Sequence, residues 1–270
     1  MLPIALQLYS VREDMEKDVY TTLKRVKSLG YDGVEFAGLF GCEPKQLKKW
    51  LGELGLVPIC AHVPYLDMIG DPDKVLGDYA EIGCRYVAIP YLTEDYRPGT
   101  PLFPSVIENA KMLGEKANKL GMTLLYHNHD FEFVKIDGQF ALDLLYASVP
   151  AEYLQTEIDV CWVRVAGEEP AGYIRKYIGR SPIVHLKDFY KSGEAARMYE
   201  LIGIKSEQPE EKSTFEFRPL GQGVQDFPPI VQASIDAGAL WFVVEQDKAT
   251  AGMTAFECAQ ASIAYLKEMK

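Results

Sequence analysis

The sequence has few cysteines, and none of them form a pair suited to metal chelation or redox chemistry. Its five cysteines are widely scattered, mostly within apolar stretches, and no two are separated by only two residues. An odd and scattered set is typical of reduced, buried thiols in a cytosolic protein. We therefore expect neither a disulfide framework nor a thiolate metal site.

Long apolar runs and an excess of basic residues are also lacking. No window approaches the ~18 uninterrupted apolar residues that a membrane span requires. The first residues, Met1 to Leu8, have no basic leader before an apolar stretch, so we expect a cytoplasmic protein without a membrane partner. The 28 Lys and Arg against 39 Asp and Glu give a net charge of −11, which argues against nucleic acid as a partner because its phosphates would be repelled.

The chain is long enough to fold around a full hydrophobic core. It has 270 residues, of which 48% are hydrophobic and 25% are charged. Chains near this length often form two domains, but α/β barrels run to about 250 residues as one domain. Such a chain buries roughly three quarters of its unfolded surface, so it needs no disulfide to stabilise it.

Short β-branched or apolar runs alternate with longer amphipathic segments along the whole chain. The runs predict strands at Ile4–Tyr9, Tyr31–Phe36, Val57–His62, Arg85–Pro90, Met122–His127, Leu154–Asp159, Ile183–Lys187 and Leu240–Glu245. The amphipathic segments predict helices near Met15–Leu29, Pro44–Leu54, Pro72–Ile82, Pro104–Leu120, Gln139–Ala147, Ala171–Ile178, Phe227–Ala237 and Thr254–Met269. Several helices are followed by glycine, which can adopt the left-handed conformation that ends a helix.

This alternation predicts a parallel sheet, because each strand needs a helical crossover to return to the same edge. Strand cores such as Trp241–Val244 are almost continuously apolar, as expected of strands that are covered on both faces. Eight such units close most naturally into a (β/α)₈ TIM barrel that forms a single domain over residues 1–270. A doubly wound open sheet is the alternative.

One connection, residues 189–226, is much longer than the others and joins the seventh strand to its helix. It is rich in charge, glycine and proline. A loop of this length in a compact domain is usually functional or disordered. Because it lies on the side of the barrel where active sites form, we predict that it is a lid, with Ser192–Lys212 over the mouth.

All four histidines fall at or just after the ends of predicted strands. His62 ends the third strand, His127 and His129 follow the fifth, and His185 lies in the seventh. A lone histidine is more often an ordinary polar residue than a ligand. However, the carboxyl ends of barrel strands converge on one face, so all four imidazoles could reach one cavity. This distribution predicts a functional site.

Carboxylates occupy equivalent positions, since Glu35, Asp159 and Glu245 end the second, sixth and eighth strands. A mixed set of His, Asp and Glu suits a divalent ion such as Mn²⁺, Co²⁺, Mg²⁺ or Zn²⁺. Such an ion would offset the cost of burying several carboxylates, although Glu35 could equally cap the next helix. Glu157 lies two residues before Asp159 and so faces the same side of the strand, where it needs a partner such as Lys187 or a histidine.

Aromatic and basic side chains near the predicted rim are compatible with a sugar-like substrate. The aromatic residues that follow strand ends are Tyr9, Tyr65, Tyr91, Phe131 and Trp162. They could stack on a pyranose-like ring, although ordinary packing explains any single one of them equally well. Lys187 and Arg218 are too few basic residues to require a phosphorylated substrate.

Five short strings carry a family resemblance. They are Tyr126–Phe133 (YHNHDFEF), Glu157–Trp162 (EIDVCW), Val184–Asp188 (VHLKD), Gly221–Gly223 (GQG) and Val244–Asp247 (VEQD). Together they resemble the xylose isomerase-like barrel superfamily, and within it the sugar phosphate isomerase/epimerase branch. The resemblance runs from the first strand to the last helix.

The resemblance implies one divalent metal ion, held by residues at the ends of strands five to eight in the order Glu, Asp, His and Glu. The corresponding residues of this chain are His127, Asp159, His185 and Glu245. His127 is a departure, because the glutamate usually found there is often one of two acid/base residues. Simple two-glutamate epimerisation therefore lacks a base, unless His129, Glu132 or Glu157 replaces it. The chemistry could instead be an elimination.

The leading hypothesis is metal-assisted proton abstraction next to the carbonyl of a sugar or keto-sugar. Return of the proton to carbon would make the protein an isomerase or epimerase, the outcome slightly favoured by the resemblance. Loss of a β-hydroxyl or a glycosidic oxygen would make it a lyase or dehydratase on a keto-cyclitol or keto-glycoside. The expected catalytic residues are Glu245, His129, Lys187 and Glu157. The expected substrate-binding residues are His62, Glu35, Trp162, Phe131, Tyr9 and Arg218.

Two other functions are less favoured. Apurinic endonucleases share the barrel, but their three-metal cluster needs many histidines, and a net charge of −11 opposes DNA binding. A non-enzymatic sugar-binding barrel would not need to keep the full ligand set and Lys187. The expected partner is a small sugar-like molecule, and a homo-oligomer is compatible because relatives often pair through the barrel rim.

Overall fold

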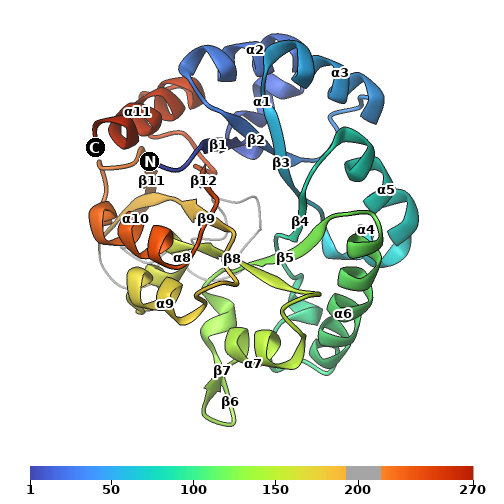
Figure 1. Cartoon of the computed structure of the whole chain (residues 1–270). Helices are drawn as coiled ribbons and strands as arrows, with labels where there is room; N and C mark the ends of the chain where they lie inside the picture. Colours follow the sequence, from blue (N-terminus) through green and yellow to red (C-terminus); the bar gives the residue numbers. More distant parts are fainter. Residues whose placement is uncertain (193–213, 270) are drawn as a thin grey trace.

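The computed structural model describes residues 1–192 and 214–269 and shows a closed barrel of parallel strands surrounded by helices (Figure 1). Its strands are β1 (Ile4–Gln7), β2 (Gly33–Ala37), β3 (Val57–His62), β4 (Tyr86–Ile89), β5 (Thr123–His127), β8 (Gln155–Asp159), β9 (Ile183–Leu186) and β12 (Trp241–Val244). Neighbouring strands pair in parallel, and β12 closes the barrel against β1. The predicted (β/α)₈ fold is confirmed, and the open sheet is excluded.

The outer helices follow the predicted pattern of starts and stops. They are α2 (Val19–Leu29), α3 (Pro44–Leu54), α5 (Pro72–Ile82), α6 (Phe103–Lys119), α7 (Ala141–Ser148), α9 (Pro170–Lys176), α10 (Phe227–Asp236) and α11 (Ala255–Glu268). The glycines after α2 and α5, Gly30 and Gly83, have φ values of 93° and 104°. Only glycine adopts this left-handed conformation without strain, so each of these two helices ends at its glycine.

Short elements that the periodicity did not predict lie at the ends of several strands. They are α1 (Arg12–Met15), α4 (Tyr65–Gly70), α8 (Val160–Val165) and three 3₁₀ helices, Leu8–Val11, Glu94–Tyr96 and Phe131–Phe133. The first strand ends at Gln7 rather than Tyr9, because the Gln7 side chain accepts a hydrogen bond from the Tyr9 amide and starts a 3₁₀ helix. Helix α8 starts at Val160, directly after Asp159, whose carboxylate caps the helix by accepting a hydrogen bond from the Trp162 amide.

The helix expected at Gln139–Ala147 begins two residues later than predicted. The first two residues of the predicted helix instead form strand β7 (Gln139–Phe140), which pairs antiparallel with β6 (Lys135–Ile136). The turn between them, Asp137 and Gly138, has φ values of 50° and 83°. An Asp-Gly pair with two positive φ angles is a typical two-residue hairpin turn.

The helices pack around the barrel to form the main core, and a second apolar cluster fills the lower part of the barrel. The second cluster consists of Ala5, Ile59, Cys60, Tyr86, Ala88, Leu125, Ile183 and Val243. All five cysteines are free, and four of them are buried. Among the described residues, we find no helix with the length and apolar character needed to cross a membrane.

The long connection after β9 begins and ends as an antiparallel ribbon of β10 (Asp188–Ser192) and β11 (Thr214–Arg218). Residues 193–213 lie outside the described part of the chain, so the lid stays a prediction. The Asp188 carboxylate accepts hydrogen bonds from the amides of Phe189, Gly221, Gly223 and Gln225, at 2.9 to 3.1 Å. A Cβ at Gly223 would lie 2.2 Å from Asp188 Oδ1, so only glycine lets this loop approach the carboxylate.

Candidate active site

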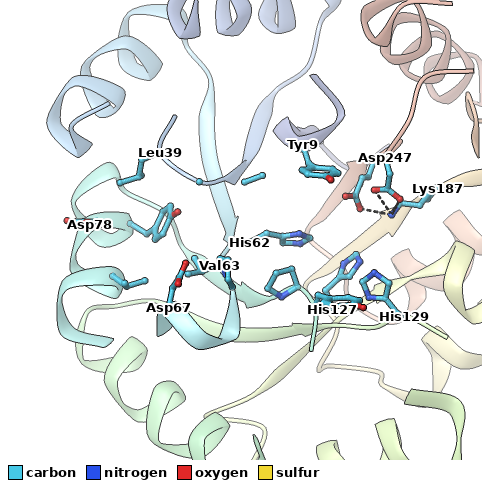
Figure 2. Close-up of a pocket in the computed structure, with 18 residues that line it drawn as sticks. Tyr9, Leu39, His62, Val63, Asp67, Asp78, His127, His129, Lys187 and Asp247 are labelled. Carbon is cyan, nitrogen blue, oxygen red and sulfur yellow. Dashed lines mark hydrogen bonds and ion pairs between the residues drawn. The ribbon is translucent and has the colours of Figure 1, made fainter. Parts of the chain in front are cut away.

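A cavity of about 610 Å³ lies at the carboxyl ends of the strands (Figure 2). Six polar residues that end or follow strands β3, β5, β9 and β12 line it, namely His62, His127, His129, Lys187, Glu245 and Asp247. Tyr9, in the 3₁₀ helix that follows β1, also lines it. Three of the four histidines predicted from the strand ends, His62, His127 and His129, therefore line one cavity, while His185 is fully buried and does not line it.

The four residues of the predicted metal set converge. His127, Asp159, His185 and Glu245 each offer one ligand atom, and these atoms all lie within 4.8 Å of one another. His185 Nδ1 is 3.0 Å from Glu245 Oε2, and His127 Nε2 is 3.8 Å from Asp159 Oδ2. Ligand atoms that surround one divalent ion tetrahedrally at about 2 Å lie about 3.3 Å apart. These separations therefore fit a shared ion.

The second nitrogen of each imidazole in this set faces a carboxylate. His127 Nδ1 lies 3.4 Å from Glu157 Oε2, and His185 Nε2 lies 2.7 Å from Glu35 Oε2. A metal-bound histidine commonly has its other ring nitrogen next to a carboxylate, which fixes its orientation and tautomer. Asp159 Oδ2 is buried and forms no hydrogen bond with the described residues. The donor set and its surroundings therefore fit a divalent metal ion.

Glu35 and Glu157 lie beneath the cavity rather than in its lining. Both are fully buried. His62 Nε2 is 2.7 Å from Glu157 Oε2 and 3.3 Å from Glu35 Oε2, and Gln7 donates a 2.8 Å hydrogen bond to Glu35. Burial alone would raise the pKa of Glu157, but the neighbouring His185 and His62 hold it well below its usual range. In this position the two carboxylates orient histidines.

Lys187 is a buried ammonium surrounded by three carboxylates. Its Nζ lies 3.0 Å from Glu245 Oε2, 3.1 Å from Asp247 Oδ2 and 3.4 Å from Asp159 Oδ2. Burial would lower the pKa of Lys187, but Asp247 and Glu245 keep it well above its usual range. Lys187 is therefore a charged donor in this structure, not a neutral base.

Asp247 is a cavity residue that was not predicted, although the string VEQD contained it. It lies two residues after Glu245, and both carboxylates contact Lys187 Nζ. Burial and Glu245 raise the pKa of Asp247, Lys187 lowers it, and the resulting value is about 7. The spacing of two between Glu245 and Asp247 was the signal that could have identified it.

His129 is a neutral imidazole in the cavity wall. Its ring lies 5.0 Å from the Trp162 ring and stacks on Phe131 at 5.6 Å between centroids. Burial, with added repulsion from His127 and Lys187, holds its pKa well below the usual value. The His129 amide donates a 2.8 Å hydrogen bond to Glu132, which fixes the backbone of this residue. The neutral ring lines the cavity.

Four expected substrate-binding residues lie outside the cavity lining. Glu35 is beneath it, and Trp162 is fully buried against Phe215 and Phe217. The Phe131 ring stacks on the His129 ring. Arg218 lies on β11, where its Nη2 pairs with Glu216 at 2.6 Å. The assignment of these four residues to substrate binding stays a prediction, while His62 and Tyr9 line the cavity as expected of substrate-binding residues.

Comparisons with known proteins agree with this architecture. A family model described as a xylose isomerase-like TIM barrel matches residues 23–269. The inosose dehydratase of Geobacillus thermodenitrificans (strain NG80-2) is 28% identical over 171 residues, which cover 60% of this chain and 53% of that protein. The chain thus spans about half the length of the curated relatives that it matches.

Solved structures share the fold at low identity. A sugar phosphate isomerase/epimerase from Parabacteroides distasonis has a TM-score of 0.77 at 23% identity, with 98% of this chain and 93% of that chain covered. The IolI protein with a bound zinc atom has a TM-score of 0.73 at 14% identity, with coverage of 99% and 98%. At these identities the likeness concerns the fold.

Proposed function

Because the chain belongs to the xylose isomerase-like TIM barrel family, we propose that it is a metal-dependent enzyme that removes a proton next to the carbonyl of a keto-sugar or keto-cyclitol. We further propose that the reaction continues as a β-elimination, so that the enzyme is a lyase of the dehydratase type. One observation carries this choice. His127 stands at the end of β5, where the resemblance leads us to expect a glutamate base. The similarity to inosose dehydratases is in line with it.

His127, Asp159, His185 and Glu245 would hold the ion. When bound, a divalent ion supplies a Lewis acid that polarises a carbonyl oxygen and makes the neighbouring carbon–hydrogen bond more acidic. Glu35 and Glu157 keep the two histidines oriented from below. These carboxylates, which lie beside the imidazole nitrogens that face away from the ion, would preorganise the ligand set before substrate arrives.

His129 is the proposed base, because it is neutral and lines the cavity beside the ligand set. Lys187 and Asp247, which are 3.1 Å apart, would serve the leaving oxygen on the other side. The Lys187 ammonium donates a hydrogen bond to the departing oxygen. Asp247, with its pKa of about 7, can supply or take up a proton near neutral pH.

Epimerisation by two glutamates is less well supported. It needs a second glutamate that faces the substrate carbon from the opposite side. Glu132 and Glu157 are the carboxylates that could replace the missing glutamate, but neither lines the cavity. Glu132 accepts hydrogen bonds from Tyr126 and from the His129 amide, and Glu157 contacts His62 and His127. Among the described residues that line the cavity, Glu245 is the one glutamate.

The proposal is tested by incubating the Mn²⁺-loaded enzyme with an inosose or a keto-sugar in D₂O. We expect deuterium at the carbon next to the carbonyl of recovered substrate, together with an unsaturated ketone that absorbs in the ultraviolet. Recovery of an epimer without any unsaturated product would replace the lyase by an epimerase. If no metal-dependent exchange occurs with either class of compound, proton abstraction itself is wrong.

Two variants separate the base from the ligand. His129→Gln should slow exchange by about 10² or more, the usual contribution of a general base, while the bound metal is retained. Glu245→Gln should weaken metal binding instead, and its exchange should recover when Mn²⁺ is raised to saturation. Full exchange in His129→Gln, with loss of exchange in metal-saturated Glu245→Gln, would transfer the role of base to Glu245.

A further inference from the structure

Trp162 is fully buried behind the cavity and does not line it. It lies in the first turn of α8, where its backbone amide donates a 2.9 Å hydrogen bond to Asp159 Oδ1. The other oxygen of that carboxylate, Oδ2, lies 3.8 Å from His127 Nε2 of the predicted ligand set. Gln225 Nε2 also donates a 2.8 Å hydrogen bond to the Val160 carbonyl of the same helix. The backbone at Trp162 is therefore fixed relative to the predicted metal ligands.

The indole ring of Trp162 contacts two residues to which the proposed reaction gives a part. Its centroid lies 5.0 Å from that of the His129 ring. Lys187 Nζ lies 5.7 Å from the indole centroid, within the range of a cation–π interaction. Figure 2 shows His129 and Lys187 at the same end of the cavity. One buried side chain therefore supports both the proposed base and the ammonium that would serve the leaving oxygen.

The two supported residues differ in what else holds them. The His129 ring stacks on Phe131 at 5.6 Å and meets the Tyr91 ring edge-on at 5.1 Å. Lys187 Nζ is attracted by its three carboxylates on one side, and on its aromatic side Phe217 lies at 5.6 Å. Removal of the indole would leave His129 between Phe131 and Tyr91, whereas Lys187 would retain Phe217. Lys187 therefore depends on Trp162 more than His129 does.

The ribbon of β10 and β11 supports Trp162 in turn. Phe215 stacks on the indole with 6.3 Å between centroids and 5° between planes, and Phe217 meets it at 81° and 6.2 Å. Phe189 stacks on Phe215 at 5.0 Å, and all three phenylalanines are buried. Close packing of this kind leaves a ring little freedom to move. The indole is thus held between the ribbon and the two residues of the cavity wall.

We propose that Trp162 is a positioning residue, which holds His129 and Lys187 at fixed positions relative to each other and to Asp159 without touching the substrate. This inference rests on the proposed function, because the parts played by His129 and Lys187 come from it. Groups that act on one substrate must be held to within about 0.5 Å of their productive geometry. Loss of the indole should impair the departure of the leaving oxygen more than the removal of the proton, because Lys187 loses more support than His129.

The direct test is Trp162→Leu in the Mn²⁺-loaded enzyme, with a keto-sugar or an inosose in D₂O. Deuterium in recovered substrate measures proton removal, and the unsaturated product measures elimination. We expect kcat for elimination to fall by about tenfold or more with KM within about twofold, because a misplaced group slows the reaction while substrate contacts remain. The ratio of exchange to elimination should rise several-fold. A misfolded fraction lowers both rates equally, so an unchanged ratio would overturn the proposal.

Matched variants separate positioning from general stability. Trp162→Phe should return the ratio toward the wild-type value, because a phenyl ring retains part of the cation–π contact. Phe217→Leu removes the other ring over Lys187 and should also raise the ratio, which keeps the test decisive if Trp162→Leu does not fold. The control is Trp241→Leu, because Trp241 packs against the lower apolar cluster and does not line the cavity. A raised ratio in this control would overturn the assignment.

Tryptophan fluorescence tests the contact without turnover. The chain has three tryptophans, so the double variant Trp50→Phe, Trp241→Phe leaves Trp162 as the single emitter. A positive charge beside an indole shifts its emission through its electric field. In this background Lys187→Met should shift the emission maximum, whereas Lys45→Met, at an exposed position on α3, should leave it unchanged. No shift in Lys187→Met would overturn the contact and the proposal with it.

Failure of the positioning role and failure of the proposed function give different results. If the wild-type enzyme exchanges and eliminates but Trp162→Leu keeps the wild-type ratio, the positioning role fails and the proposed function stands. If no keto compound undergoes exchange but Lys187→Met shifts the emission, the proposed function fails. The part of Trp162 in the reaction then fails with it, while its packing against Lys187 stands.

Discussion

The lower and upper halves of the barrel interior differ sharply although the same strands form both. Inward-facing residues recur every second position along a strand. On five strands an apolar residue of the lower cluster is followed two residues later by a buried polar residue of the upper half. The pairs are Ala5 and Gln7, Cys60 and His62, Leu125 and His127, Ile183 and His185, and Val243 and Glu245.

The lower half of the barrel interior stabilises the fold, whereas the upper half forms the candidate active site. Burial of a large apolar side chain in the lower half contributes roughly 1.5 to 3 kcal/mol each. Buried charges in the upper half cost free energy unless they are paired. Here Glu35, Glu157, His62 and His185 form contacts of 2.7 to 3.6 Å. In the upper half, the buried carboxylates and histidines therefore offset each other's cost of burial. Removal of one partner would leave the other buried without a partner.

The largest expected effect is the loss of the metal from the upper half. Asp159→Ala should reduce the bound ion from about one per chain to nearly none and remove turnover, because a carboxylate ligand is lost. Asp159 also caps α8, so Asp159→Asn is the matched variant that keeps a capping side chain. Elemental analysis measures the ion. A fully loaded Asp159→Ala protein would contradict the assignment.

A substitution in the lower half should reduce stability and leave metal binding unchanged. Leu125→Ala leaves a void in the apolar cluster and should lower the free energy of unfolding by about 2 to 5 kcal/mol. Metal affinity and kcat/KM of the folded fraction should stay within about twofold. Urea denaturation and metal titration of the same preparation give both numbers. A metal affinity that falls together with stability would show that the two halves are coupled.

A smaller effect concerns Glu132, which lies behind His129. Burial raises the pKa of Glu132 from 4.5 to about 8. The folded protein therefore keeps a proton that the unfolded chain releases, so the contribution of Glu132 to stability falls as pH rises from about 4.5 to about 8 and is constant above that. Glu132→Gln should lose this slope in urea denaturation at pH 5, 7 and 9.

The control for that experiment is Glu108→Gln, because Glu108 is an exposed glutamate on α6. It should leave the pH dependence of the wild-type protein unchanged. If Glu132→Gln and wild type keep a constant difference in stability from pH 5 to pH 9, then Glu132 does not hold its proton.

Much of the fold was predictable because it depends on local signals. The alternation of apolar runs and amphipathic segments gave all eight barrel strands, and the family resemblance is confirmed by the match over residues 23–269. The short helices α4 and α8 were missed. Each has only six residues, so neither develops a helical period, and α8 depends on one capping contact from Asp159.

The sequence predicted which residues form the site better than it predicted how deep each of them lies in the barrel. The strand-end positions of the histidines and carboxylates predicted a common site, and the family resemblance implied its ligands. Those ligands, His127, Asp159, His185 and Glu245, lie together in the structure. Depth in the barrel depends on how neighbouring strands are staggered. Glu157 pairs in register with His127, whereas Asp159 pairs with His185 one step higher. No single strand encodes that offset. Glu157 was predicted to face into the barrel as a catalytic candidate, and it lies beneath the cavity, where it contacts histidines.

A crystal structure of the protein soaked with Mn²⁺, measured with anomalous scattering, tests the metal site most directly. We expect one strong anomalous peak about 2.0 to 2.3 Å from His127, Asp159, His185 and Glu245. We also expect Lys187 still to contact Asp247. A peak held instead by His62 and Glu157 in the lower layer, or no peak within reach of these four residues, would contradict it.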